Sequence, residues 1–282
     1  MPESHPFCLP KSVRRACLQS RFSCAVVLFL SLSAQALAAQ ARAAQSARPL
    51  PDAPQAQAQD AVTIRGAPRD ILHDQEAIWT SPLRLRPHDL KWLAPFALAT
   101  GAAIATDHRA MSQVVSHDAS FNNANVNASN ALIGGFIAAP VALFSYGHFK
   151  QSDHAREAGI LGGEALLDGV VVEQGMKLIF WRERPAVDSA RGRFFQSSVG
   201  VDSSFPSSHS VLAWATASAI AGEYPSRWTQ IAVYSVATGV SLTRVLGQQH
   251  FPADVLVGSA AGWLIGHYVV HRRHRHHNSA TR

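Results

Sequence analysis

The sequence predicts an all-α fold, a helical bundle of about six helices. From residue 92 onward, apolar runs are separated by polar, proline or glycine breaks, and each run exceeds the usual length of a strand. None of them alternates at the period of two that marks a half-buried strand, and Ala and Leu are plentiful, which favours helices packed into a bundle. The expected helices cover Trp92–Thr106, Asn130–Phe149, Ala155–Phe180, His209–Glu223, Trp228–Val245 and Asp254–Val270.

Two stretches of the body are polar. Ser112–Ser129 is rich in asparagine, so we expect a loop there. Charged residues interrupt Ala155–Phe180, so one side of that helix is polar and either lines a polar cavity or faces water. The interrupting residues are Glu157, Glu164, Asp168, Glu173 and Lys177.

Composition and charge narrow the class of protein. Of the 282 residues, 47% are hydrophobic and 16% are charged, which is apolar for a soluble protein and polar for a many-pass membrane protein. The net charge of +6 is concentrated at the ends: residues 1–38 carry +3 and the residues after His271 carry +4, which leaves −1 for the body. A nucleic-acid-binding protein would carry a basic face on its body, so we set that class aside.

The N-terminus has the three-part pattern of a secretory signal peptide. Basic residues end at Arg21, an apolar run covers Cys24–Leu32, and small residues follow, so we expect a mature protein that begins near Ala39. The apolar run is short for a membrane span, although an uncleaved anchor is the alternative. All three cysteines precede this cleavage site. A mature chain without cysteine has no disulfide, thiolate metal site or cysteine nucleophile.

These features divide the chain into four segments. We expect a signal peptide over residues 1–38, a flexible linker and N-terminal extension over residues 39–84, a helical domain over residues 85–271 and a basic tail over residues 272–282. In the tail, arginines interleave the histidines and would repel a cation, so we expect a solvated basic end rather than a metal site.

The first candidate cluster is Lys177-Leu-Ile-Phe-Trp-Arg-Glu-Arg184-Pro185. Two cations seven residues apart lie two helical turns from each other and can point the same way, with Pro185 ending the helix nearby. Arg and Lys at such a helix end suit a phosphate group. By itself, this pattern also fits basic residues that only offset the helix dipole.

The second candidate cluster is the run Ser203-Ser-Phe-Pro-Ser207-Ser208-His209-Ser. Small hydroxylated residues and a proline before an apolar run predict a helix N-terminus, where free N–H groups and the dipole attract an anion. His209 in the first turn is a candidate proton donor. The alternative is a plain serine cap with an uninvolved histidine.

The third candidate cluster is Thr243-Arg244-Val-Leu-Gly-Gln-Gln-His250-Phe-Pro252-Ala-Asp254. Pro252 suits the first position of the next helix, which puts His250 at its start and Asp254 in its first turn. The spacing of four lets the carboxylate meet the imidazole, fix its tautomer and make the other nitrogen a better nucleophile. The alternative is a His–Asp cap pair without chemistry.

The order and spacing of the three clusters resemble the signature of the PAP2 superfamily. The chain reads Lys-x6-Arg-Pro, then Pro-Ser-x-His, then Arg-x5-His-x3-Asp, and the resemblance covers about Ala155 to Val270. This superfamily comprises type-2 phosphatidic acid phosphatases, bacterial class A acid phosphatases and vanadium haloperoxidases. Two positions depart from its usual pattern: Ser208 replaces a glycine but keeps the backbone N–H, and Thr243 replaces a serine but keeps the hydroxyl.

The resemblance implies a PAP2/haloperoxidase-like bundle and a phosphatase mechanism. It implies that His250 attacks phosphorus to form a phosphohistidine, that Asp254 orients His250, and that His209 protonates the leaving group and then activates water. The residues implied to hold the phosphate oxygens are Lys177, Arg184, Ser207, Ser208 and Arg244. No metal and no cofactor are implied, because three cations can supply the charge that Mg²⁺ supplies elsewhere.

The implied substrate is a phosphate ester, either a lipid phosphate or a small phosphomonoester. A vanadium-dependent haloperoxidase and an inactive lipid-phosphate-binding protein are the alternatives. By length only Asn130–Phe149 approaches a comfortable membrane span. We expect an exported protein in the inner membrane whose site faces the periplasm, with a soluble periplasmic protein as the alternative. Lys150 and Arg156 on the inner turn fit the positive-inside rule.

Overall fold

The computed structural model describes residues 64–196 and 200–280, of which Val201 and residues 275–280 are described by their backbone only. This part of the chain contains seven α-helices and no strand, so the all-α prediction is confirmed. The predicted signal peptide, its cleavage site and most of the predicted linker lie outside the described residues. The helices are α2 (Ala67–Thr80), α3 (Leu90–Arg109), α4 (Ala119–Lys150), α5 (Asp153–Phe180), α6 (Ser208–Glu223), α7 (Arg227–Leu246) and α8 (Pro252–Ala280).

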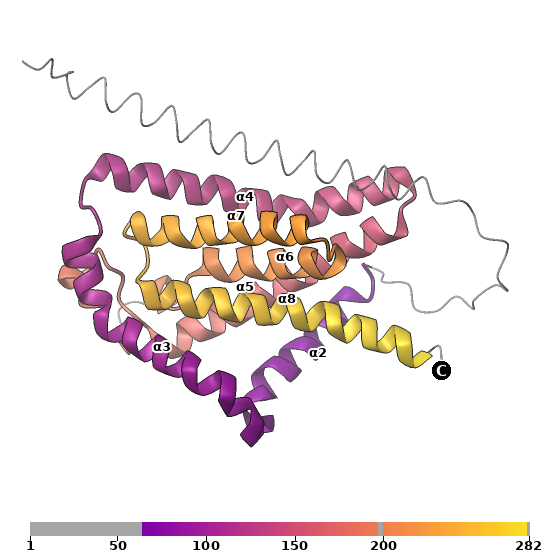
Figure 1. Cartoon of the computed structure of the whole chain (residues 1–282), viewed down its shortest axis with the longest axis horizontal. Coiled ribbons are helices and arrows are strands. Elements are labelled where there is room, and N and C mark those ends of the chain that lie inside the picture. The colour runs from indigo at the N-terminus through magenta and orange to yellow at the C-terminus, as the bar shows by residue number, and fades with distance from the viewer. Residues whose placement is uncertain (1–63, 197–199, 281–282) are drawn as a thin grey trace, which may run out of the picture. The chain divides into compact units, whose positions relative to one another are not determined.

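Helix α6 lies at the centre of the bundle. It packs against α4, α5, α7 and α8, and these helices run side by side in Figure 1. Its side chains are mostly alanine, serine and other small groups, which lets all four neighbours approach it closely. The largest buried cluster joins α5, α6 and α8. Its bulkier members are Leu161, Val172, Val211, Ile265, Val269 and Val270.

Glycines set the short distance between α6 and α8. A Cβ atom on Gly262 would lie 2.2 Å from the Val211 carbonyl oxygen, and one on Gly266 would lie 2.2 Å from the Ala215 carbonyl oxygen. No other residue type allows so close a backbone approach. The contact aligns the N-termini of the two helices, where the Ser207 N–H donates to the Asp254 carbonyl oxygen at 3.2 Å.

Helix α2 extends the fold beyond the six predicted helices. Its Gln75 side chain donates to Asp168 Oδ1 on α5 at 2.8 Å. Its buried Asp74 accepts a hydrogen bond from Arg272 of α8, whose guanidinium also lies 3.6 Å from Glu164. The polar side of α5 therefore does not face water: Glu164, Asp168, Glu173 and Lys177 are buried. Arg272, the first residue of the predicted basic tail, is mostly buried as well, with a side chain that is 15% exposed. The prediction of a solvated end is therefore wrong for this residue.

The predicted loop over Ser112–Ser129 is wrong except at residues 115–118. A short π-helix covers Ala110–Val114, and α4 then begins at Ala119. Asp118 caps α4 by accepting from the Phe121 N–H at 2.9 Å, which explains why the helix starts there. The asparagines are helical rather than turn residues, and this first part of α4 reaches the site described below.

Two described helices are long and apolar enough to cross a membrane, judged by length and composition alone. They are α4, most of whose apolar stretch is exposed, and the Pro252–His274 part of α8, half of whose apolar stretch is buried in the bundle. The sequence-based expectation that only Asn130–Phe149 approaches such a length was therefore too narrow, because α8 continues without a break past residue 271.

Candidate active site

The three predicted clusters meet at one end of the bundle. Lys177 lies in the last turn of α5, Arg244 in the last turn of α7, and Asp254 in the first turn of α8. His209 lies in the first turn of α6. It is close enough to Arg244, His250, Lys177 and Arg184 to interact with them electrostatically. The connection between α7 and α8, which contains His250, marks this end at the left of Figure 1.

Lys177 is buried and held on two sides. Its Nζ donates to Ser208 Oγ at 2.7 Å and lies 3.4 Å from Glu173 Oε2, one turn earlier on α5. Ser208 Oγ in turn donates to Glu173 Oε2 at 3.1 Å. The serine at the usual glycine position therefore does more than keep a backbone N–H, because its hydroxyl joins Lys177 to Glu173.

Arg184 reaches the site by a different route from the one predicted. Helix α5 ends at Phe180, and Trp181 follows with a left-handed φ of 39°. The two-turn helical spacing that we predicted between Lys177 and Arg184 is therefore wrong, and Arg184 lies in the loop after the helix. Its guanidinium is held by Asp202 Oδ1 at 2.9 Å and donates to the Gln249 carbonyl oxygen at 3.3 Å.

The start of α6 presents unused donors. Ser207 is the N-cap residue, but its side chain makes no cap hydrogen bond, and within the described residues its buried Oγ has no partner. The first N–H groups of any α-helix lack intrahelical acceptors and form a ready anion site. The interpretation of this run as a plain serine cap is thus not supported at Ser207.

Arg244 also keeps one donor unused. Its Nη1 donates to Ser129 Oγ of α4 at 3.2 Å, while its buried Nε has no acceptor in the described part of the chain. Buried polar atoms are normally hydrogen-bonded. A bound anion between the start of α6 and the end of α7 would satisfy both Arg244 Nε and Ser207 Oγ.

The His250 imidazole is fixed by a backbone carbonyl. Its Nδ1–H donates to the Ser204 carbonyl oxygen at 2.7 Å, whereas Asp254 Oδ2 lies 3.8 Å from Nδ1. The carboxylate and the imidazole therefore lie close together, as the spacing predicts, but 3.8 Å exceeds hydrogen-bonding distance, so the Ser204 carbonyl oxygen and not Asp254 fixes the tautomer. Ser204 also donates its hydroxyl to Asp254 Oδ2 at 2.5 Å, so it connects the two residues. This arrangement leaves the Nε2 lone pair of His250 unprotonated.

Both histidines are poised in their neutral form. Burial lowers the pKa of His250 to about 4, although the Asp254 charge opposes this shift. Burial also lowers the pKa of His209 to about 3, and the positive charges of Arg244, Lys177 and Arg184 add to that effect. The Nε2–H of His209 donates to Asn130 Oδ1 of α4 at 3.0 Å.

Sequence reasoning missed several residues of this site. Ser204, Glu173 and Asn130 contact predicted site residues, and Arg182 and Asp107 contact Asp254 or its helix. Three of them carried a sequence signal, since Arg182 lies within the first cluster, Ser204 within the second, and Glu173 one helical turn before Lys177. Asp107 and Asn130 come from segments without a motif.

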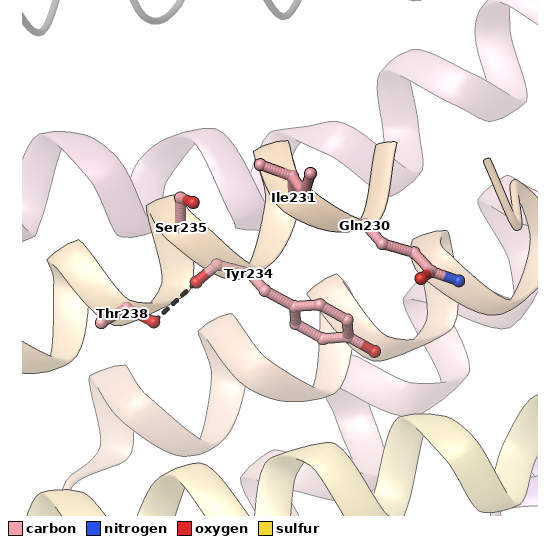
Figure 2. A pocket seen from close by; sticks show the side chains of 5 residues that line it. All are labelled: Gln230, Ile231, Tyr234, Ser235 and Thr238. Carbon is pink, nitrogen blue, oxygen red and sulfur yellow. Dashed lines mark hydrogen bonds between the residues drawn. The ribbon is translucent and has the colours of Figure 1, made fainter. Parts of the chain in front are cut away.

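A shallow hollow on the outer face of α7 contains none of the predicted site residues. It is lined by Gln230, Ile231, Tyr234, Ser235 and Thr238, shown in Figure 2. The dashed line there is the bond from Thr238 Oγ1 to the Tyr234 carbonyl oxygen, at 2.7 Å. The lining holds no charged or strongly nucleophilic side chain, so we do not assign chemistry to it.

The fold and the site define a helical bundle with cationic and histidine side chains gathered at one end. Residues 158–277 match the family model described as the PAP2 superfamily. This part of the chain is therefore a PAP2 superfamily domain, and the resemblance drawn from the three motifs is confirmed.

Two further comparisons give individual relatives. A lipid A 1-phosphatase of Porphyromonas gingivalis is 35% identical over 106 residues, which are 37% of this chain and 21% of that protein. The chain thus spans about a fifth of the length of this curated relative. The crystal structure of a transmembrane PAP2-type phosphatidylglycerolphosphate phosphatase from Bacillus subtilis matches 75% of this chain and 96% of its own, with 18% identity and a TM-score of 0.41. So low a structural similarity supports no inference about function.

Proposed function

We propose that the chain is a metal-independent phosphatase that hydrolyses phosphate esters through a phosphohistidine intermediate. The observation that carries the proposal is the pair of buried, unused donors, Ser207 Oγ and Arg244 Nε, beside a neutral buried His250. Hydrogen-bond donors that have no partner and lie among positively charged side chains can bind the oxygens of a phosphate group. A phosphohistidine also requires a histidine nucleophile next to these donors, and His250 is that residue in our proposal.

In the first step, His250 Nε2 attacks phosphorus in line. The N–P bond forms while the P–O ester bond breaks, and His209 gives its proton to the departing alkoxide. In the second step, His209 takes a proton from water, the oxygen attacks phosphorus, and the N–P bond breaks to release inorganic phosphate. Lys177, Arg184 and Arg244 neutralise the charge on the equatorial oxygens, which is the main demand of phosphoryl transfer.

The protonation states suit this sequence. His250 is neutral above about pH 4 and so offers a lone pair over the physiological range. His209 has to be positively charged in the first step, whereas burial and the surrounding positive charges lower its pKa to about 3. A bound phosphate group offsets the surrounding positive charges that contribute to this shift, so substrate binding raises the pKa of His209 and allows it to act as the acid.

We further propose that the substrate is a lipid phosphate and that the protein lies in the membrane. The relative named above is a lipid A 1-phosphatase. Large apolar side chains are exposed on six of the described helices, among them Leu98 of α3, Val141 of α4, Ile179 of α5 and Trp228 of α7. Exposed apolar surface of this extent is typical of lipid contact.

The proposed activity is tested with the purified full chain on three esters: phosphatidate, an isoprenyl diphosphate and a soluble aryl phosphate. We expect release of phosphate, fastest from a lipid ester. A denaturing quench at alkaline pH during turnover should trap a phosphoprotein that is stable to base and labile to acid, as a phosphohistidine is. His250→Ala should lose both turnover and the trapped species.

His209→Ala is the informative companion variant. It should slow release most for esters with poor leaving groups, because those groups depend on a proton donor. With an activated aryl ester it should still accumulate the phosphoprotein. Full activity in His250→Ala would overturn the assignment of the nucleophile, and absence of phosphate release from all three esters would overturn the function.

We propose that the active-site end faces the outside of the membrane. The other end carries Lys150, Arg156, Arg227 and Arg273, which fits the positive-inside rule. In a background with the three native cysteines replaced, Asp202→Cys near the site should react with a membrane-impermeant maleimide on intact cells with a permeabilised outer envelope. Arg227→Cys should react only after lysis, and the opposite pattern would reverse the orientation.

A further inference from the structure

Arg182 is the largest fully buried side chain of the described structure, and no step of the proposed reaction uses it. It lies between two aromatic rings, 4.6 Å from the centroid of Phe194 and 4.2 Å from that of Phe251. An arginine side chain is costly to bury, and proteins retain such a group where it is paired and satisfied. The question is therefore what this cation is paired with.

The guanidinium bridges two buried carboxylates from distant helices. Its Nη1 donates to Asp254 Oδ1 at 2.5 Å, and its Nη2 donates to Asp107 Oδ2 of α3 at 2.7 Å. Its Nε donates to the Gly192 carbonyl oxygen at 3.1 Å. The second oxygen of Asp107 accepts from the Ala253 N–H at 3.1 Å, in the first turn of α8.

These contacts fix both ends of the Asp254 carboxylate. Arg182 holds Oδ1, while Ser204 Oγ and the Phe251 N–H donate to Oδ2 at 2.5 and 2.9 Å. Oδ2 is the oxygen that faces His250 Nδ1 at 3.8 Å. Without Arg182, the carboxylate could rotate about its last torsion, and nothing else in the described structure bonds to Oδ1.

Arg182 also fixes the segment that sets the tautomer of His250. The Ser204 N–H donates to the Arg182 carbonyl oxygen at 2.7 Å, and the Arg182 N–H donates to Ser203 Oγ at 2.9 Å. The Ser204 carbonyl oxygen is the acceptor for His250 Nδ1. The side chain of Arg182 thus holds the Asp254 carboxylate, and its backbone holds Ser204. These two residues are the ones that contact the His250 imidazole.

We propose that Arg182 and Asp107 are positioning residues that hold Asp254 and Ser204 against His250, so that its Nε2 is aimed at phosphorus and the positive charge of the phosphohistidine is stabilised. This inference rests on the proposed function. Neither residue touches the phosphate cradle, so their loss should lower kcat and leave anion binding almost unchanged. A misplacement of about 1 Å by an outer residue can lower a rate by about 100-fold.

The test compares Arg182→Ala with Arg193→Ala in the full chain. Arg193 lies in the same loop and pairs with Glu183 and Asp188, and its side chain is half exposed. We expect kcat on an aryl phosphate to fall by about 100-fold or more in Arg182→Ala, with KM and the inhibition constant for inorganic phosphate within about threefold of the wild type. Arg193→Ala should stay near the wild type in all three.

Chemical rescue separates a positioning role from a merely structural one. Millimolar guanidinium should restore part of the kcat of Arg182→Ala, since the planar ion fits between the two rings and bridges the same carboxylates. It should not stimulate Arg193→Ala. Arg182→Lys should rescue poorly, because an ammonium group cannot bond both carboxylates in this geometry.

Asp107→Asn keeps the acceptor for the Ala253 N–H and is the second variant, should Arg182→Ala fail to fold. We expect a loss of kcat of about tenfold at unchanged phosphate inhibition. A wild-type kcat in both Asp107→Asn and a folded Arg182→Ala would overturn this inference and leave the proposed function standing. Equal losses of kcat and of phosphate affinity would have the same consequence. An inactive wild-type protein would instead overturn the proposed function together with it.

Discussion

The close contact between α6 and α8 gives a sharp prediction for Gly262→Ala. The added Cβ would lie 2.2 Å from the Val211 carbonyl oxygen, 2.9 Å from the Ala215 nitrogen and 3.0 Å from the Trp214 Cβ. Contacts below 3.0 Å are essentially not seen for a Cβ atom. The two backbones must therefore separate by about 0.8 Å at this point, because neither a carbonyl oxygen nor a helix nitrogen can turn aside.

This separation should affect both stability and turnover. Overpacking of this kind costs about 1–3 kcal/mol, which lowers the Tm of a domain of this size by several degrees. Helix α8 contains Asp254, and α6 contains Ser208 and is preceded by its N-cap residue Ser207, so the shift also widens the site. A displacement approaching 1 Å corresponds to a loss of kcat of up to about 100-fold.

Gly134→Ala provides the matched control. A Cβ at Gly134, on α4, would meet nothing within 4 Å in the described structure. There the substitution should stabilise by about 1 kcal/mol through the better helix propensity of alanine, without loss of activity. Thermal unfolding and steady-state kinetics on both purified variants make the comparison. If Gly262→Ala resembled Gly134→Ala in Tm and kcat, the account of the α6–α8 contact would be refuted.

Three further predictions follow from the electrostatics of the molecule. Burial raises the pKa of Asp74 to about 8, so the native state favours the protonated acid; this contribution to stability is complete below about pH 4 and is lost as the pH rises through 8. Asp74→Asn should therefore flatten the decline of Tm over that range, and an unchanged decline would contradict this role. Activity should persist in excess EDTA, because Lys177, Arg184 and Arg244 supply the positive charge; a loss that Mg²⁺ restores would refute the mechanism. Micromolar vanadate should inhibit phosphate release competitively, and the vanadate-loaded protein should oxidise halide with peroxide no faster than His250→Ala. Robust bromination without phosphate release from any ester would favour the haloperoxidase instead.

The sequence by itself determined the helical class, the approximate positions of most helices and the residues of the three motifs. Apolar runs of helical length and a fixed spacing of lysine, arginine, histidine and aspartate are local properties, readable without knowing what each segment contacts. The helix start at Pro252 was predicted for the same reason, because the fixed φ of proline acts on its own residue.

The tertiary structure decided how these residues are held. Arg184 leaves the helix after Phe180, a carbonyl oxygen of Ser204 rather than Asp254 accepts from His250, and Arg182 bridges Asp107 to Asp254. The hydrogen bonds among these residues join positions up to 75 apart in sequence. The asparagine-rich segment that looks like a loop is helical because Asp118 caps it and because Asn130 and Ser129 meet His209 and Arg244. Such partners are chosen by the packing of whole helices, here by glycines that bring α8 onto α6, and no local pattern encodes that choice.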